Sequence, residues 1–186
     1  MEPEAVTLPI AACQREGSGE RAAFERIMQD YERRVLRIAL RLLRHPQDAQ
    51  DAAQEVFLRL YKHLGRLDGS RGYEAWLFRV TVHVCRDIAR RRRRAAGLEE
   101  APELVSCDPH AEDRTALAEQ RAIVRRGLGF LGEKERAALV LRDVEGLSTR
   151  EVAGILGSSE NTVRSQISTA RLKLREYTAR LQKRRL

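Results

Sequence analysis

The stretch STREVAGILGSSENTVRSQISTARLKL, residues 148–174, decides the fold of the C-terminal half. Ser148 and Glu151 have the spacing of a capping box, in which each side chain accepts a hydrogen bond from the other residue's backbone N–H. A helix from Thr149 to Leu156 should stop at Gly157, because glycine takes a positive φ at little steric cost. The stretch therefore predicts a short, capped helix followed by a sharp reversal of the chain.

A second helix is expected after the turn, from Glu160 to Leu174, with Ser159 as its N-cap. Ala153 in the first helix is small, which lets two helices approach closely. This pattern is typical of a helix-turn-helix, whose second helix fits the major groove of DNA. The apolar residues of the second helix recur every three or four positions and would anchor it: Val163, Ile167, Ala170 and Leu174.

The opposite face of this second helix is polar and free to project outward. In the major groove arginine reads guanine, and serine or asparagine reads several base edges. Basic residues between Arg171 and Arg185 add positive charge for phosphates. The competing interpretation is an ordinary helical hairpin with a charged face, but cap, small residue, glycine turn and basic second helix together favour DNA binding. The outward residues are Asn161, Arg164, Ser165, Ser168 and Thr169.

The composition of the whole chain also points to a nucleic acid. Its 186 residues hold 35 Lys and Arg against 27 Asp and Glu, a net charge of +8 that attracts polyanions. With 42% hydrophobic and 33% charged residues, the chain is too apolar for a wholly disordered protein and too charged for a membrane protein. We expect no membrane insertion. Three cysteines make no disulfide framework, which indicates the reducing cytoplasm.

Helical periodicity covers most of the chain. Three helices are expected in the N-terminal half, at about 22–44, 47–64 and 73–96, and two precede the helix-turn-helix, at about 118–131 and 133–144. The residues of the third helix that should face a core are Trp76, Leu77, Val80, Val84 and Ile88.

A change of composition separates the two halves. The stretch 99–113 holds six acids and no Lys or Arg, and it cannot bury enough apolar surface to fold alone. We therefore expect an all-α protein of two small helical domains joined by a flexible acidic linker, the C-terminal one a helix-turn-helix. The expected boundaries are an N-terminal tail at 1–20, a first domain at 21–96, a linker at 97–117 and a second domain at 118–186.

A basic stripe runs along the third predicted helix. Segment 79–94 holds seven basic residues and one acid, and Trp76 stands just before it. Aromatic rings beside cations stack and hold single-stranded nucleic acid. The competing interpretation is that Trp76 is simply a core residue. The stripe consists of Arg79, His83, Arg86, Arg90 and Arg93.

Motifs in both halves resemble one known family. DAQDAAQEVFLRL at 48–60 and WLFRV at 76–80 are similar to region 2 of the extracytoplasmic-function sigma factors, the minimal two-domain form of the sigma-70 family of bacterial initiation factors. EGLS at 145–148 and TVRS at 162–165 are similar to region 4. Region 4 alone also resembles the DNA-binding domains of response regulators, but both regions in this order, without region 3, favour a sigma factor.

The resemblance implies a protein that binds core RNA polymerase, directs it to specific promoters and helps melt the −10 element. Region 2 would dock on the β′ clamp helices and region 4 on the β flap. The implied polymerase-binding residues are Asp51, Gln54, Glu55, Leu58 and Arg59. The implied −10 residues are Asp68, Ser70, Arg71, Trp76, Arg79, His83, Arg86 and Arg90. The implied −35 residues are Thr149, Asn161, Arg164, Ser165, Ser168, Thr169 and Lys173.

The same resemblance implies an anti-sigma factor as a further partner, no cofactor, and a place in the bacterial cytoplasm, with the nucleoid when active. The chain departs from the family pattern at several positions. His83 stands where asparagine is usual, Gly132 where proline is usual, and Ser158 where a buried aliphatic residue is common. Ser168 and Thr169 replace a bulky or basic pair, which leaves the −35 sequence open.

Three other functions were weighed against this one. A helix-turn-helix regulator that is not a polymerase subunit leaves the helices at 47–64 and 73–96 without a purpose. A zinc site would need His83, Cys85, Cys107 and His110. Side chains two positions apart on a helix point in different directions, so Cys85 is expected to be a small core residue. An enzyme is disfavoured, because the chain has no phosphate-binding loop, carboxylate pair or nucleophile motif.

Overall fold

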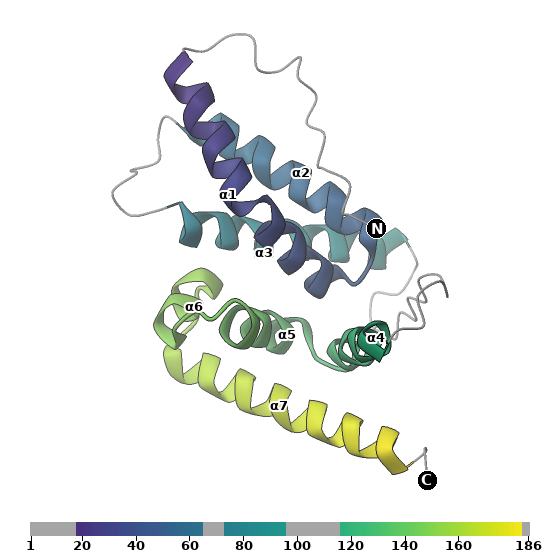
Figure 1. Cartoon of the computed structure of the whole chain (residues 1–186). Helices are drawn as coiled ribbons and strands as arrows, with labels where there is room; N and C mark the ends of the chain where they lie inside the picture. The colour runs from purple at the N-terminus through teal and green to yellow at the C-terminus, as the bar shows by residue number, and fades with distance from the viewer. Residues whose placement is uncertain (1–17, 65–72, 96–115, 184–186) are drawn as a thin grey trace. The chain divides into compact units, whose positions relative to one another are not determined.

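The computed structural model describes residues 18–64, 73–95 and 116–183, and every element in these ranges is a helix (Figure 1). The all-α prediction is confirmed. The chain divides into two compact units, Met1–Arg92 and Arg93–Leu186, each with its own set of buried apolar residues. Among the described helices, none is long and apolar enough to cross a membrane.

The first unit is built on a pair of packed helices, α1 (Ser18–Leu43) and α2 (Pro46–His63). Their connection is short because Arg44 takes a positive φ of 61° and ends α1. His45 then caps α2, its Nδ1 accepting a hydrogen bond from the Asp48 backbone N–H at 3.4 Å. Small residues let α1 and α2 approach closely, since three alanines of α2 are fully buried: Ala49, Ala52 and Ala53.

A third helix, α3 (Glu74–Ala95), completes this unit. The ring of its Phe78 lies edge-on to Tyr31 of α1, with centroids 6.5 Å apart. Arg34 of α1 is ion-paired with Glu74 and lies over the Phe78 ring. Near the other end of α3, Arg92 is ion-paired with Asp48 of α2 at 3.1 Å. Apolar and charged contacts thus fix α3 against both other helices.

The buried face of α3 differs from the predicted one. Leu77 and Val84 are buried as expected, but Trp76, Val80 and Ile88 are only half-buried. Neighbouring positions fill the core instead: Phe78, Thr81, Val82 and Cys85. The face is centred elsewhere on the helix because the Thr81 hydroxyl bonds the Leu77 carbonyl at 2.7 Å and can therefore be buried like an apolar group. The expectation that Cys85 is a core residue is confirmed.

The second unit consists of α4 (Ala116–Gly129), α5 (Glu133–Leu139), the π-helix η4 (Val140–Val144), α6 (Thr149–Leu156) and α7 (Glu160–Lys183). α7 packs chiefly on α5, and also on α6 and α4. Gly127 eases the close approach of α4, since a Cβ there would lie 3.0 Å from the Leu174 side chain, which would have to shift. α6 has the predicted bounds, whereas α7 continues nine residues beyond the predicted Leu174.

The helix predicted at 133–144 is not uniform. Its second half winds as a π-helix, in which the Glu145 N–H bonds the Val140 carbonyl five residues back. The wider turn leaves Val140 and Leu141 buried while Asp143 faces outward. Periodicity does not reveal such a turn, because it depends on how the segment packs against other helices.

Two ion pairs tie α7 to the preceding helices. The Lys173 ammonium donates to both carboxylate oxygens of Glu135 on α5, each at 2.8 Å. Arg171 donates through Nε and Nη2 to the Asp143 carboxylate of η4, at 2.9 and 2.7 Å. Both pairs join residues far apart in the sequence, so they fix the position of α7 rather than its helicity.

Glu135 makes a further hydrogen bond that affects the pKa of its carboxyl group. Its carboxylate accepts the backbone N–H of Gly132, the N-cap of α5, at 2.9 Å. Burial alone would raise the pKa of Glu135, but the bonds from Lys173 and Gly132 outweigh burial and lower the pKa below its ordinary value of 4.5. A proline at position 132, which the resemblance to sigma region 4 would imply, lacks this N–H, so Gly132 and Glu135 form a local cap of their own.

Replacing Glu135 by glutamine should lower the unfolding free energy at pH 7 by about 1 kcal/mol, because the ion pair with Lys173 is lost. Urea denaturation followed by circular dichroism measures this difference. Since the folded-state pKa of Glu135 is depressed, the stabilisation is complete above the ordinary value of 4.5 and is lost as the pH falls through the folded-state pKa. Wild type and variant should therefore converge in acid.

Glu25→Gln is the matched control, because Glu25 forms an exposed pair with Arg21 one turn away on α1, at 3.1 Å. Such a pair contributes about 0.5 kcal/mol or less. A Glu135→Gln difference that stays the same from pH 7 into acid would contradict the stabilising role of the carboxylate.

Candidate nucleic-acid interface

The helix-turn-helix begins with the predicted capping box. The Ser148 hydroxyl accepts the Glu151 N–H at 3.2 Å, and the Glu151 carboxylate accepts the Ser148 N–H at 2.7 Å. The bonds from the Ser148 side chain and backbone also lower the pKa of Glu151, since both favour the ionised carboxylate. The start of α6 is thus fixed by residues adjacent in sequence.

The turn follows as predicted. Gly157 has φ 62° and ψ 40°, the left-handed conformation that favours glycine. The Ser158 N–H bonds the Ala153 carbonyl at 3.0 Å and closes α6. Ser159 then caps α7, its hydroxyl accepting the Thr162 N–H at 3.1 Å. Two capped helices and one left-handed residue set the angle at which α7 leaves the turn.

The N-terminal half of α7 is fixed on one side and open on the other. Val163, Ile167 and Ala170 are buried, as the spacing predicted, while Leu174 is half-buried. The five residues predicted to project outward are all exposed, and we call them the reading face: Asn161, Arg164, Ser165, Ser168 and Thr169. These side chains are therefore accessible to a partner as large as a DNA duplex.

Arg164 is held within the reading face. Its Nη1 donates to Asn161 Oδ1 and its Nη2 donates to Glu160 Oε2, both at 3.0 Å. Glu160 is not among the residues predicted from the sequence. The signal was available, because an acid four residues before an arginine lies beside it on a helix.

The two other predicted −35 residues lie on α6 and α7. Thr149 is half-buried at the start of α6. Lys173 was predicted to lie near phosphates, and the structure joins it to Glu135. Arg171 is exposed, and its bond to Asp143 raises the pKa of its guanidinium. Sequence reasoning missed Glu135 and Asp143, since no local pattern reveals a partner so far along the chain.

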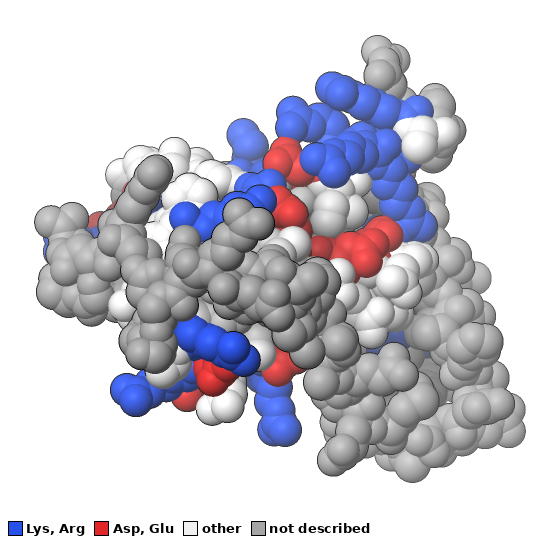
Figure 2. Space-filling view, turned by 90° about the horizontal axis from the view of Figure 1, so that it is seen from above, with Lys and Arg blue, Asp and Glu red and all other residues white. Residues whose placement is uncertain are grey.

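The predicted −10 residues lie in the first unit. Arg79, His83 and Arg90 are exposed along α3, and Arg86 is half-buried. Arg90 bonds Asp87 at 2.7 Å. In the view of Figure 2, Lys and Arg side chains cluster at the upper right, with fewer acidic side chains among them. The other predicted residues, Asp68, Ser70 and Arg71, lie outside the described residues.

Trp76 lies at the margin of the core. It is half-buried, and its ring lies 6.1 Å from that of His63 at the end of α2. Because Trp76 is half-buried, one part of its ring packs against the protein and the other part faces solvent. The core interpretation applies to the first part, and the stacking interpretation applies to the second.

The predicted polymerase-binding residues share the outward side of α2. Asp51 is exposed and the others are half-buried. Glu55 and Arg59 form an ion pair at 2.7 Å, and Asp51 accepts a bond from Gln47 at 3.5 Å. The set has helical spacing, which places it on one stripe opposite the buried alanines: Asp51, Gln54, Glu55, Leu58 and Arg59.

Of the four residues considered for a metal site, the structure describes His83 and Cys85. Cys85 is buried in the core, whereas His83 is exposed. Cys107 and His110 lie outside the described residues. Within residues 18–64, 73–95 and 116–183, no group of three or more metal-ligating side chains forms a site.

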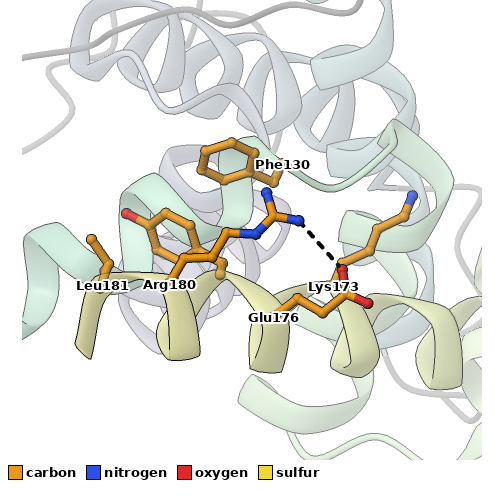
Figure 3. A pocket seen from close by; sticks show the side chains of 6 residues that line it. Phe130, Lys173, Glu176, Arg180 and Leu181 are labelled. Carbon is orange, nitrogen blue, oxygen red and sulfur yellow. Dashed lines mark ion pairs between the residues drawn. The ribbon is translucent and has the colours of Figure 1, made fainter. Parts of the chain in front are cut away.

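A groove beside the C-terminal half of α7 was not predicted. It has a volume of about 420 Å³, and the Phe130 and Tyr177 rings lie 4.7 Å apart at its side (Figure 3). Phe130 is 49% exposed, which is unusual for so large an apolar side chain. Lys173, Glu176 and Arg180 add charges at the groove, and Glu176 pairs with Arg180 at 4.0 Å. The groove was missed because the predicted helix was followed only to Leu174, although no glycine or proline marks an end there.

Comparisons with known proteins match both units. Residues 27–95 match the model of sigma-70 region 2, and residues 121–174 match that of sigma-70 region 4. The chain is 36% identical over 157 residues to the ECF RNA polymerase sigma factor SigM of Mycobacterium tuberculosis, covering 84% of this chain and 78% of that protein. The chain belongs to the extracytoplasmic-function sigma factors. Another relative, the ECF sigma factor SigE of Mycolicibacterium smegmatis, is 34% identical over 89% of this chain and 66% of that protein.

Two solved structures share the helical fold of this sigma factor. CnrH, solved in complex with the cytosolic domain of CnrY, has a TM-score of 0.67 and 26% identity over 87% of this chain and 91% of that one. The sigma factor RpoE of Bartonella quintana, solved with the anti-sigma factor NepR, shares the fold, with a TM-score of 0.69 and 21% identity over 84% of this chain and 97% of that one. As a sigma factor, this protein acts with RNA polymerase in transcription initiation, and the regulator that is not a polymerase subunit is not supported.

Two glycines near the turn offer a matched test of its geometry. Gly157→Ala should destabilise the helix-turn-helix by about 1–2 kcal/mol, because φ at this position is 62°. Gly154→Ala, three residues earlier, should be neutral or stabilising by up to about 1 kcal/mol, because an added Cβ meets nothing within 4 Å and alanine favours the helix. Thermal unfolding of both variants measures the difference, and equal effects would contradict the role assigned to Gly157.

Proposed function

We propose that this sigma factor reads the −35 element through the reading face of α7 and the −10 element through α3, while α2 holds core RNA polymerase. The observation that carries the proposal is the reading face itself. The face combines an arginine, the side chain that reads guanine, with small hydrogen-bonding side chains. All of these are exposed, while the opposite side of the helix is buried. Phosphate contacts position such a helix, and base contacts give it sequence preference. Thr149 and Lys173 are proposed to lie near phosphates.

The α3 stripe is proposed to bind the −10 element and to help melt it. Arg79, His83, Arg86 and Arg90 supply donors and charge for the strand backbone. The exposed part of Trp76 supplies a surface on which an unstacked base can rest. Asp68, Ser70 and Arg71 are proposed to join them from the segment before α3. Opening the duplex would then be favoured because the single strand gains contacts that the duplex lacks.

Two surfaces are proposed for the polymerase. The stripe at Asp51, Gln54, Glu55, Leu58 and Arg59 would dock on the β′ clamp helices, since it mixes acidic, basic and apolar groups on one side of α2. The Phe130–Tyr177 groove would receive the β flap, because it combines the exposed Phe130 ring and the half-buried Tyr177 ring with charged side chains. The groove and the reading face use different halves of α7, so both partners can bind at once.

The remaining assignments follow from this role. The chain would supply promoter selection while the polymerase supplies the chemistry, so we propose that it is not an enzyme and needs no cofactor. An anti-sigma factor is proposed as a regulator, since the two solved neighbours were captured with NepR and CnrY. The proposed location is the bacterial cytoplasm, with the nucleoid when active. The proposed domains are 21–96 and 118–186, with a linker at 97–117.

Transcription by a reconstituted holoenzyme tests the DNA-reading role. The purified chain with bacterial core RNA polymerase should give run-off transcripts from a pooled promoter library that share one pair of elements. Arg164→Ala should weaken use of its preferred −35 sequence by about 1–3 kcal/mol, because one bidentate base contact is lost. A loss equal on every sequence would assign Arg164 to phosphate instead. Absence of transcripts, with sequence-specific duplex binding by the chain alone, would overturn the sigma role.

A double variant tests the polymerase contact. Gln54→Ala with Glu55→Ala should reduce affinity for core polymerase at least about tenfold, a cost of about 1.4 kcal/mol, while the circular dichroism spectrum stays unchanged. Fluorescence anisotropy of the labelled chain measures the affinity. Glu25→Ala with Gln29→Ala changes the same residue types at exposed positions of α1 and should leave affinity as in wild type. Equal affinity for both double variants would refute the assignment of α2.

A further inference from the structure

Glu160 lies beside Arg164 in the first turn of α7, where an acid suits the helix dipole, and the proposed function gives it no contact with DNA. Glu160 is the first residue of α7, and its side chain is 42% exposed next to the reading face. Exposed ion pairs one helical turn apart contribute little to stability. The bond between Glu160 and Arg164 is therefore a weak reason for an acid at this position.

An acid here also opposes DNA binding by charge alone. The Glu160 carboxylate cancels the charge of Arg164, and the other residues of the reading face are neutral. The residues of the reading face together with Glu160 thus carry no net charge that would attract phosphates. A carboxylate can accept hydrogen bonds but cannot donate them, so near DNA it is tolerated where it meets a donor. In the major groove, the donor that acidic side chains select is the N4 amino group of cytosine.

The geometry leaves both side chains able to contact bases. The guanidinium of Arg164 has more N–H donors than its bonds to Asn161 and Glu160 use, and the carboxylate of Glu160 has a second oxygen, Oε1. Residues one helical turn apart have Cβ atoms about 5–6 Å from each other, more than the roughly 3.4 Å between base pairs. The paired Arg164 Nη2 and Glu160 Oε2 atoms lie 3.0 Å apart, so the two side chains can reach adjoining base pairs.

We infer that Glu160 is a specificity-determining residue of this sigma factor, which accepts a hydrogen bond from a cytosine N4 in the base pair next to the guanine read by Arg164. The bond between the two side chains fixes their relative position, so guanine and cytosine are selected at neighbouring positions of the −35 element. This inference rests on the proposed function of α7. It adds an acceptor to a set of residues that otherwise consists of donors and mixed groups.

The test is transcription by the reconstituted holoenzyme from a library randomised in the −35 element. The wild type should prefer cytosine at one position beside the guanine that Arg164→Ala releases. Glu160→Gln should lose roughly tenfold of that preference and shift toward adenine, whose N6 and N7 suit an amide. Glu160→Asp keeps the charge but shortens the side chain, so it should also lose the preference.

The outcomes separate contact from charge. Glu25→Gln changes the same charge at an exposed ion pair of α1 and should leave every base preference unchanged. If Glu160→Gln only raises the use of all sequences equally, and Glu160→Asp behaves as wild type, Glu160 acts through charge and the inference is wrong. If the wild type itself shows no −35 preference, the proposed function of α7 fails instead. Thermal unfolding of each variant confirms that it is folded.

Discussion

The second unit depends on one constraint: α7 must be immobilised on one side while its other side stays open. Buried residues such as Val163 and Ile167 anchor one side of α7 in the core of the second unit. Two long-range ion pairs, from Glu135 and Asp143, fix its position along and around its axis. The left-handed residue Gly157 sets the direction from which it enters. Hydrogen bonds to DNA bases require side chains held to within fractions of an ångström, and this arrangement supplies that precision without using the exposed side.

The parts of the fold that the sequence predicted are those encoded locally. Ser148 and Glu151 are three residues apart, and each satisfies a backbone N–H of the other, so the start of α6 needs no distant partner. The buried face of α3 was predicted less well, because Thr81 enters the core after bonding a backbone carbonyl. The π-turn of η4 was not predicted, since it reflects packing against other helices and carries no period of its own.

The candidate site divides in the same way. The exposure of Ser165 and Ser168 followed from helical spacing and is confirmed, but their contact with DNA remains a prediction. The partners of Lys173 and Arg171 lie 38 and 28 residues away in sequence. Only the tertiary fold brings them together, so composition and periodicity could not reveal them. The Phe130–Tyr177 groove required knowing that α7 continues past Leu174, where no glycine or proline marks an end.

One feature of α7 also restricts how this protein can change over evolution. The helix is continuous for 24 residues, so its two halves keep a fixed phase relation of about 100° per residue. A single-residue insertion between Ala170 and Tyr177 would rotate the aromatic groove relative to the reading face by that angle and shift it by about 1.5 Å. Substitutions leave the relative orientation of the two surfaces unchanged. Insertions and deletions preserve that orientation only when they add or remove whole helical turns. The number of residues in α7 between the two surfaces is therefore more constrained than the identity of those residues.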